Sequence, residues 1–330
     1  MTGVQTCALP ISDGDDRARR PIGLRGDFGA VAQLVERLHG MEEARGSIPL
    51  SSTRVRRFSR CRLPFTRDAY SERMPRTVIA QISDTHIPGR GEDSHPGADP
   101  VGNLTAALVH ASQRCAGVVI TGDCAAKAGT DAEYEAFTEV IATATVPVWL
   151  APGNHDDSEK MQRHFNLPSV NGRCDYVVDL PGGRLVVLDT SRLGREDGSL
   201  DESQTKWLDH QLQGHRSLVV MHHPCIRVGG SAFDNILLDQ DSVQRLAAVV
   251  ARHDVFAVSA GHAHMSCFAT FAGTQGMIAP SCAYEFGMVD GVFSYQLGEP
   301  QYLEHSWGAD GSNYLVRVVT VDPALWRTMH

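Results

Sequence analysis

Five short polar blocks constrain this chain of 330 residues more than any other feature, because each one directly follows an apolar run typical of a buried strand. The blocks combine glycine, histidine, aspartate and asparagine, and they are Asp84-Thr85-His86, Gly122-Asp123, Gly153-Asn154-His155-Asp156, His222-His223-Pro224 and Gly261-His262-Ala263-His264. The apolar runs are residues 78–82, 118–120, 146–150, 218–221 and 255–258. Sites in α/β proteins lie where strands end. We therefore expect the blocks to meet along one edge of a sheet.

The donor atoms in these blocks predict a site for two transition-metal ions. Imidazole, carboxylate and one amide oxygen suit Mn, Fe, Zn or Co better than Mg or Ca, and the absence of thiolates argues against structural zinc. Side chains two residues apart on extended backbone point to one face, which would bring Asp84 together with His86. The same spacing would bring His262 together with His264. Two neighbouring cations need a shared anion, and Asp123 is the candidate for it.

The charges of such a site predict an anionic substrate. Two divalent ions, the carboxylates of Asp84 and Asp123 and one bridging hydroxide leave about one net positive charge, which would attract a phosphodiester monoanion. Water held by the metals would be acidified enough to supply that hydroxide near neutral pH. The hydroxide would then attack phosphorus in line.

The five blocks, in this order, resemble the pattern of the calcineurin-like metallophosphoesterases. The resemblance implies an α/β fold, the four-layer α-β-β-α sandwich of the metallo-dependent phosphatase type. It implies two sets of metal ligands: Asp84, His86, Asp123 and His264 for one ion, and Asp123, Asn154, His222 and His262 for the other. His155 matches a histidine that binds no metal, contacts the phosphoryl oxygen and assists the leaving alkoxide.

Short loop motifs resemble one branch of this family more closely, the class III cyclic-nucleotide and glycerophosphodiester phosphodiesterases. They include Asn154-His155-Asp156-Asp157, Leu188-Asp189-Thr190, Gly198-Ser199-Leu200 and His222-His223-Pro224. The chain departs from the branch after Asp123, where no acidic residue follows, and at Cys225, which replaces a proline. Three alternatives use the same metals: a phosphomonoesterase or protein phosphatase, a dinucleotide polyphosphate hydrolase, and a metal-binding scaffold without activity.

Other residues near the blocks have expected supporting roles. We expect Asp156 and His223 to orient ligands rather than to bind metal. Asp157 is expected to cap the helix that includes residues 161–165. Two loops, residues 88–100 and 225–241, follow ligand blocks and should overhang the metals. Their candidate substrate contacts, each of which could also be an ordinary loop residue, are Arg90, Arg227, Phe233 and Asn235.

The rest of the chain after residue 74 fits an α/β domain. Helices are expected over residues 100–115, 131–142 (with Asp131 as N-cap), 203–212 and 241–253. Later apolar segments have few helices between them and suggest a second sheet, and they are residues 268–271, 277–278, 292–297 and 314–321.

Residues 1–73 differ from the single catalytic domain expected over residues 74–330. Residues 1–12 resemble a translated sequencing adapter and residues 29–53 a translated transfer-RNA gene, so we expect a non-native or disordered extension. It holds 13 arginines, no lysine and nine acids, so the formal charge of −9 for the whole chain becomes −13 without it.

The negative charge of residues 74–330 limits the partners that we expect for the domain. So acidic a domain is a poor partner for polymeric nucleic acid, whereas a small phosphodiester drawn to the metals remains compatible. No apolar run approaches the roughly 20 residues that span a bilayer, so no membrane partner is expected. Scattered cysteines without a signal peptide suggest the cytoplasm. Exposed strands in the last 65 residues would suit a homo-oligomer.

Overall fold

The computed structural model of the protein describes residues 76–229, 233–290 and 292–321. They all lie within one compact unit, residues 66–330. The extension expected over residues 1–73 lies outside the described residues. Within the described ranges, no helix is long and apolar enough to cross a membrane.

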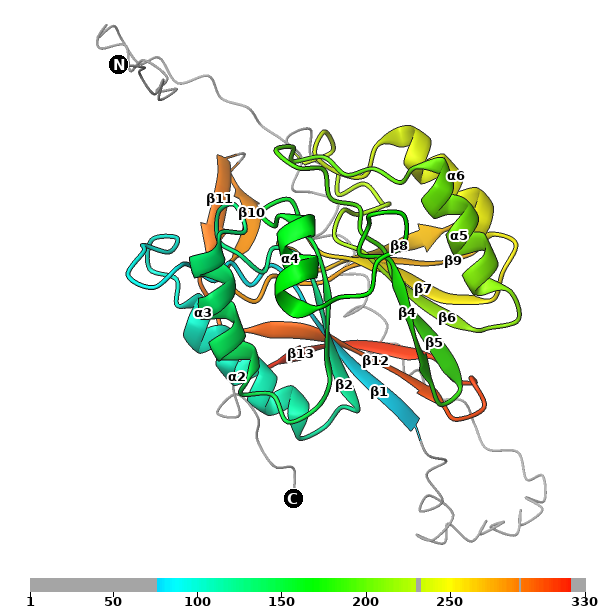
Figure 1. The fold of residues 1–330 in the computed structure, drawn as a ribbon, viewed down its shortest axis with the longest axis horizontal. Coiled ribbons are helices and arrows are strands. Elements are labelled where there is room, and N and C mark those ends of the chain that lie inside the picture. Colours follow the sequence, from blue (N-terminus) through cyan, green and yellow to red (C-terminus); the bar gives the residue numbers. More distant parts are fainter. Residues whose placement is uncertain (1–75, 230–232, 291, 322–330) are drawn as a thin grey trace, which may run out of the picture. The chain divides into compact units, whose positions relative to one another are not determined.

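The first sheet contains five strands in the order β13-β12-β1-β2-β3 (Figure 1). Its parallel part consists of β1 (Arg76–Ile82), β2 (Gly117–Thr121) and β3 (Val148–Ala151). Two antiparallel strands extend it, β12 (Gln301–Gly308) and β13 (Leu315–Thr320). Because β1, β2 and β3 are parallel, the loops that follow them lie at the same edge of the sheet.

The second sheet contains six strands in the order β4-β5-β6-β7-β9-β8. Four neighbouring strands are parallel, namely β5 (Gly183–Val187), β6 (Ser217–Val220), β7 (Val255–Ala260) and β9 (Thr274–Ile278). The antiparallel strands at its two edges are β4 (Tyr176–Leu180) and β8 (Cys267–Phe271). A separate antiparallel hairpin follows, made of β10 (Glu285–Val289) and β11 (Val292–Gln296).

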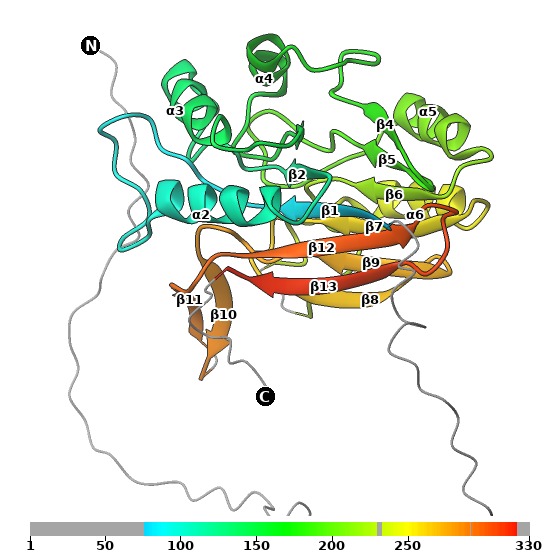
Figure 2. The same cartoon turned by 90° about the horizontal axis from the view of Figure 1, so that it is seen from below.

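Helices cover the outer face of each sheet (Figure 2). Three hydrophobic clusters fill the spaces between the layers. The helices against the first sheet are α2 (Pro100–Ser112), α3 (Asp131–Ile141) and α4 (Ser158–Phe165). Those against the second sheet are α5 (Glu202–Leu212) and α6 (Gln240–Val250). Between the sheets, β-branched and aromatic residues such as Ile79, Val220 and Trp307 are buried together. The expected α-β-β-α layering is confirmed.

Three expectations about the elements need correction. The late strands do not form one second sheet, because β8 and β9 extend the sheet of β6 and β7, β12 and β13 extend that of β1, and β11 pairs with β10 in a separate hairpin. The polar blocks therefore follow strands of both sheets rather than of one. Helix α3 is capped by Thr130, whose side chain accepts a hydrogen bond from the Glu133 amide, and Asp131 is the first helical residue. Asp157 caps α4 as expected.

Candidate metal centre

The proposed metal ligands lie on turns that directly follow β1, β2, β3, β6 and β7. Five of them have a positive φ, between 46° and 71°, although none is glycine, and they are Asp84, His86, Asp123, His262 and His264. A left-handed residue redirects its side chain relative to extended backbone. Asp84 and His86, like His262 and His264, therefore do not share one face of an extended strand, and that expectation is wrong. The pairs do reach one pocket, but through left-handed turns.

The first donor group brings together Asp84, His86, Asp123 and His264, whose ligand atoms all lie within 4.8 Å of one another. The Nε2 atoms of His86 and His264 are 3.0 Å apart, and His264 Nε2 is 3.5 Å from Asp84 Oδ1. All four residues are buried. Two carboxylates and two imidazoles at this separation form a donor set that suits a divalent transition metal.

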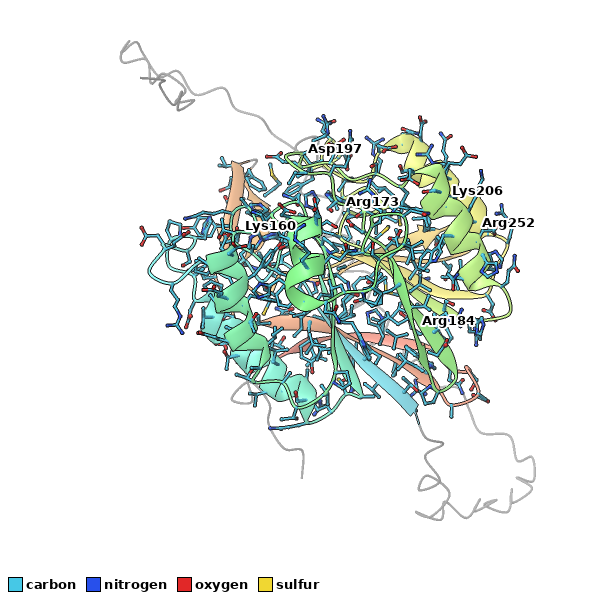
Figure 3. All side chains as sticks on the ribbon, viewed as in Figure 1. Lys160, Arg173, Arg184, Asp197, Lys206 and Arg252 are labelled. Atoms are coloured by element: carbon cyan, nitrogen blue, oxygen red, sulfur yellow. The ribbon has the colours of Figure 1, made fainter. Side chains whose placement is uncertain are left out.

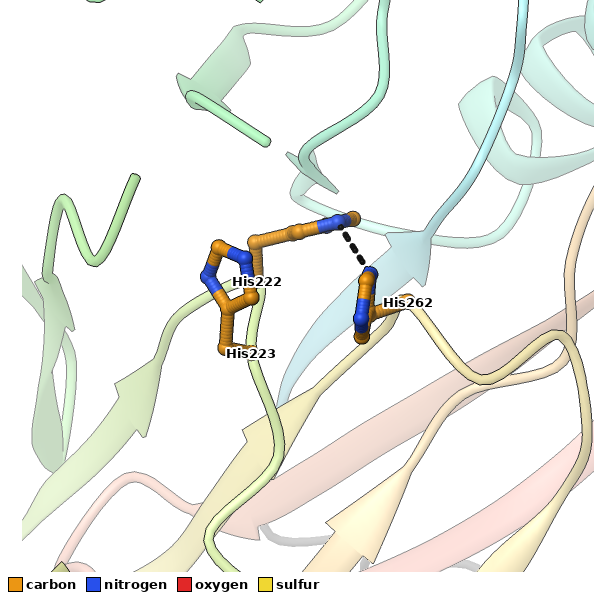
Figure 4. A group of neighbouring side chains, drawn as sticks. All are labelled: His222, His223 and His262. Atoms are coloured by element: carbon orange, nitrogen blue, oxygen red, sulfur yellow. Dashed lines mark hydrogen bonds between the residues drawn. The ribbon is translucent and has the colours of Figure 1, made fainter. Parts of the chain in front are cut away.

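The second donor group centres on the Nε2 atom of His222. This atom lies 2.9 Å from Asn154 Oδ1, 3.1 Å from His262 Nδ1 and 3.4 Å from Asp123 Oδ1. Figure 4 shows the contact between the His222 and His262 rings, with His223 beside them. Like the first group, it offers nitrogen and oxygen atoms but no thiolate.

Asp123 connects the two groups through its two carboxylate oxygens. Oδ1 faces His222 at 3.4 Å, whereas Oδ2 faces His86 at 3.7 Å. The backbone amide of His155 donates to Oδ1 and helps to hold the carboxylate in place. Two glycines allow this approach, because a Cβ atom on Gly153 would lie 2.2 Å from Asp123 Oδ1 and one on Gly122 would lie 2.3 Å from His222 Nδ1.

Backbone carbonyls determine which nitrogen of each histidine faces the centre. The Nδ1–H groups of His222 and His264 donate to the carbonyls of Thr121 and Tyr284, at 2.8 and 2.9 Å. His262 instead donates from Nε2 to the carbonyl of Ile236 at 2.8 Å. Such partners orient the ring and leave the other nitrogen available as a ligand.

The protonation states of the buried histidines fit a bound cation. Burial lowers the pKa of His86 to about 4 and that of His264 well below its usual range, so both rings are neutral near pH 7. Burial raises the pKa of Asp84 to about 7, with a further contribution from Asp123. In the first group the lone pair of His264 Nε2 therefore lies beside another imidazole nitrogen and a carboxyl oxygen. A cation placed between these atoms would be bound by all three.

His222 holds a proton where the second cation would bind. Burial alone would lower its pKa, but the charge of Asp123 and the hydrogen bond to it raise the pKa to about 9. For Asp123, burial opposes ionisation, yet the neighbouring imidazoles of His222, His155 and His86 hold the pKa well below its usual range. A metal ion at the second group would displace the His222 proton.

His155 lies at the centre but belongs to neither donor group. Its ring contacts that of His86 edge to face, with 5.0 Å between the ring centroids. Its Nδ1 atom is buried and has no hydrogen-bond partner among the described residues. The side chain also lines the pocket over the metal-binding groups. These contacts support the expectation that His155 faces the substrate and binds no metal.

Asp156 joins the two loops that carry Asp123 and Asn154. Its carboxylate accepts hydrogen bonds from the backbone amides of Cys124, Ala125 and Gly153, at 2.9 to 3.1 Å. Burial, together with Asp123, raises the pKa of Asp156 to about 6. Its contacts therefore support an orienting role.

Thr190 holds the ring of His223 beside the second donor group. The Thr190 hydroxyl lies 2.9 Å from His223 Nδ1 and accepts from the His223 backbone amide at 3.2 Å. His223 could join a metal group with His222 and His262, since their donor atoms lie within 4.8 Å of one another. We favour His222 as the ligand because its Nε2 atom also faces Asn154 and Asp123.

A pocket of about 270 Å³ opens over the two donor groups. One side is formed by proposed ligands and His155. The other side is apolar and aromatic, and its residues are Phe233, Ile236, Tyr284, Phe286 and Phe293. Glu196 is the only charged side chain besides Asp123 among the described residues that line it, and no lysine or arginine does so. Basic residues such as Lys206 and Arg252 lie at the periphery instead (Figure 3).

Of the four expected substrate contacts, only Phe233 lines this pocket. Arg90 forms an exposed ion pair with Glu139. Arg227 pairs with Asp234 at 3.1 Å and lines, with Asn235, a separate cavity of about 350 Å³. The sequence did not show where these side chains would lie. Arg90, Arg227 and Asn235 are therefore left out of the proposed substrate site.

Glu196 and the aromatic residues 284, 286 and 293 line the pocket but were not expected there from the sequence. None of them belongs to a ligand block. Tyr284 and Phe286 follow β9 at the edge of the sheet where His264 follows β7, and the backbone of Phe286 donates to the carbonyl of His264. These residues reach the pocket because β9 pairs in parallel with β7, and this pairing cannot be predicted from neighbouring residues in the sequence.

This fold and donor set define a metal-dependent phosphoric ester hydrolase. Residues 77–266 match the family described as calcineurin-like phosphoesterase, and the chain belongs to that family.

Individual relatives agree with the expected phosphodiesterase branch. A probable glycerophosphodiester phosphodiesterase of Arcobacter nitrofigilis is 30% identical over 197 residues, which cover 57% of this chain and 71% of the relative. A cAMP/cGMP dual specificity phosphodiesterase of Mycobacterium tuberculosis is 33% identical over 225 residues, which cover 64% and 69%. A solved structure, the purple acid phosphatase PPD1 from yellow lupin seeds, shares the fold with a TM-score of 0.59 at 14% identity, covering 75% of this chain and 52% of that one.

Proposed function

We propose that the protein hydrolyses a small phosphodiester monoanion with two transition-metal ions drawn from Fe, Mn, Zn and Co. The observation that carries this proposal is the position of Asp123, whose two oxygens face two separate donor groups. One ion would be held by Asp84, His86, Asp123 and His264. The other would be held by Asp123, Asn154, His222 and His262. Two such ions acidify water and offset negative charge on a phosphoryl group.

The side chains of this chain supply the remaining parts of the reaction. Asn154 and the histidines hold neutral donors toward the centre, so the two carboxylates leave net positive charge for an anion. Water loses one proton to solvent, and as its oxygen forms a bond to phosphorus the ester P–O bond breaks. His155 gives a proton to the departing alkoxide and regains one from solvent, so the products are a phosphomonoester and an alcohol.

The walls of the pocket favour a diester over the alternatives. A phosphomonoester dianion or a polyphosphate carries further negative charge, for which proteins commonly supply arginine or lysine. Neither residue type lines the described pocket, and Glu196 would repel such a group. A phosphodiester carries one negative charge and has two ester arms, one of which can occupy the aromatic side. Relatives named for cyclic-nucleotide and glycerophosphodiester hydrolysis support the same substrate class.

A substrate panel with defined metals tests this function. The metal-depleted chain is reloaded with Mn, Fe, Zn or Co, and turnover is measured with bis-p-nitrophenyl phosphate and p-nitrophenyl phosphate. Cyclic AMP, 2′,3′-cyclic nucleotides and glycerophosphocholine complete the panel. We expect metal-dependent hydrolysis of diesters in preference to the monoester. A clear preference for the monoester would overturn the phosphodiesterase assignment, and bound metal without any hydrolysis would indicate a scaffold.

Metal content provides an independent readout. The chain should bind two ions, as measured by elemental analysis, and Asp123→Asn should lose metal from both groups. Asp179→Asn is a matched control, because Asp179 is an exposed aspartate on β4. Normal metal content in the Asp123 variant would contradict the bridging role.

A further inference from the structure

The part of the pocket lining that is not formed by proposed ligands and His155 includes aromatic rings and one carboxylate. Phe233, Phe286, Phe293 and Tyr284 contribute the rings, and Glu196 contributes the charge. We propose that this side binds an ammonium group carried by a short alcohol arm of the diester, as in choline or ethanolamine phosphodiesters. The inference rests on the proposed hydrolysis of a phosphodiester at the same site. The walls of the pocket would then select phosphodiesters whose alcohol arm carries an ammonium group.

The rings are arranged for a rounded cation rather than a flat base. Neighbouring rings cross at 45° to 69°, with centroid separations of 4.8 to 5.9 Å among Phe233, Phe286, Phe293 and Tyr284. Two parallel faces would be needed to sandwich a planar nucleobase. Crossed rings instead form an aromatic wall whose faces are set at several angles, and ring faces attract ammonium groups through their negative quadrupole.

Glu196 supplies a carboxylate that forms no ion pair within the described part of the chain. It is exposed in the loop between β5 and α5, and no ion pair joins it to any of the described residues. The adjacent cations Arg192 and Arg195 both pair with Asp197, at 2.7 and 2.6 Å. A carboxylate accepts hydrogen bonds but cannot donate them, so it suits an ammonium group better than a second phosphate.

The aromatic wall lies directly beside the proposed metal ligands. The ring of Phe286 stacks on His264 with 4.5 Å between centroids, and Tyr284 stacks on His86 at 5.5 Å. A phosphate held at the metals would therefore have the wall within reach of a short ester arm. Glycerol would contact the same wall, but it carries neither the positive charge nor the apolar surface that these residues complement.

A matched pair of chromogenic diesters isolates the effect of the positive charge. The substrates are p-nitrophenyl phosphocholine and p-nitrophenyl 3,3-dimethylbutyl phosphate, in which carbon replaces the quaternary nitrogen. We expect kcat/KM of the metal-loaded chain to be about tenfold higher for the choline ester. In E196Q this ratio should fall toward one, and in Phe293→Leu it should fall about threefold because the ring face is lost.

Matched control variants address nonspecific effects. Glu135→Gln removes an exposed carboxylate on α3, and Phe268→Leu removes a comparably exposed ring on β8, and neither residue lines the pocket. Both should retain the choline preference of the parent chain. Equal kcat/KM values for the two esters in the parent chain would overturn the ammonium site while leaving the phosphodiesterase proposal intact.

A binding measurement keeps the inference testable if neither ester is hydrolysed, a result that would overturn the proposed function. Saturation transfer from protein to the N-methyl protons of choline should be detected by NMR and should be lost in E196Q; absence of transfer to the parent chain would overturn the site. Product release from two substrates then shows whether the choline ester is a free molecule or a lipid headgroup. Hydrolysis of soluble glycerophosphocholine identifies a free ester, and hydrolysis only of phosphatidylcholine vesicles identifies a lipid headgroup. Hydrolysis of neither would overturn the assignment to choline esters.

Discussion

At the scale of single residues, His155 differs from the other histidines of the centre because its ring faces the pocket without joining a donor group. We predict that His155→Ala lowers kcat by about 100-fold or more, because general acid assistance to the leaving group is lost. Both metals should remain bound. Steady-state kinetics with a diester that releases an alkoxide, such as cyclic AMP or glycerophosphocholine, and elemental analysis measure the two effects.

His264→Ala provides the comparison for that experiment. His264 is a proposed ligand whose Nε2 atom faces His86 and Asp84, so its loss should reduce metal content together with activity. Loss of metal from the His155 variant would mean that His155 is itself a ligand. A better leaving group should also reduce the penalty of His155→Ala, since p-nitrophenolate needs less protonation than an alkoxide.

The order of the blocks allowed the proposed ligands to be chosen from the sequence, whereas their backbone geometry and the substrate contacts could not be predicted. Left-handed turns at Asp84 and His262 leave no pattern in residue type, because aspartate and histidine also occur on strands. Arg90 looked available because its partner, Glu139, lies 49 positions away. A charge in a loop does not show which distant charge will neutralise it.

At the scale of elements, the capping box of α3 stabilises the helix beside the loop that follows Asp123. Thr130 Oγ1 accepts from the Glu133 amide at 3.2 Å, and Glu133 accepts from the Thr130 amide at 2.8 Å. We predict that Thr130→Ala lowers the free energy of unfolding by about 1 kcal/mol. Urea denaturation measures this change. Thr105→Ala, within α2, should change it by no more than about 0.5 kcal/mol.

Most helices and all site-bearing strands could be predicted, the helices from periodic apolar residues and the strands from continuous apolar runs. Strands β4, β5, β10 and β12 were not among the expected strands. In β12 the buried positions include Glu304, His305 and Ser306, and these polar residues are paired with neighbouring strands of the same sheet, so the strand lacks an apolar signature. In β10, Gly287 interrupts the run and Met288 and Val289 are exposed.

At the scale of the whole molecule, one polar network crosses the interface between the two sheets. His305 on β12 lies 2.9 Å from Gln81 Oε1 on β1, which also accepts from Ser259 on β7 at 2.6 Å. The other nitrogen of His305 lies 2.7 Å from the hydroxyl of Tyr314. Burial lowers the pKa of His305 to about 3. The ring is therefore neutral in the folded protein over most of the acid range.

This network predicts a pH dependence of stability. Below pH 6.5 an unfolded His305 binds a proton that the folded state excludes, so folding stability falls as pH decreases from about 6.5 toward 3. His305→Gln should reduce the slope by about one proton, which corresponds to roughly 1.4 kcal/mol per pH unit. Urea denaturation of metal-depleted protein at several pH values measures the slope. The exposed His210→Gln serves as control, and an unchanged slope in His305→Gln would contradict the assignment.

At the left-handed turns that carry the proposed metal ligands, selection for folding stability opposes selection for metal binding. A left-handed residue other than glycine costs roughly 1 to 2 kcal/mol, and histidine has less local compensation than aspartate or asparagine. Replacing His86, His262 or His264 with glycine would therefore relieve backbone strain while removing a ligand. A laboratory evolution experiment that rewards thermal stability alone, in the absence of metal, would enrich inactive variants at these positions.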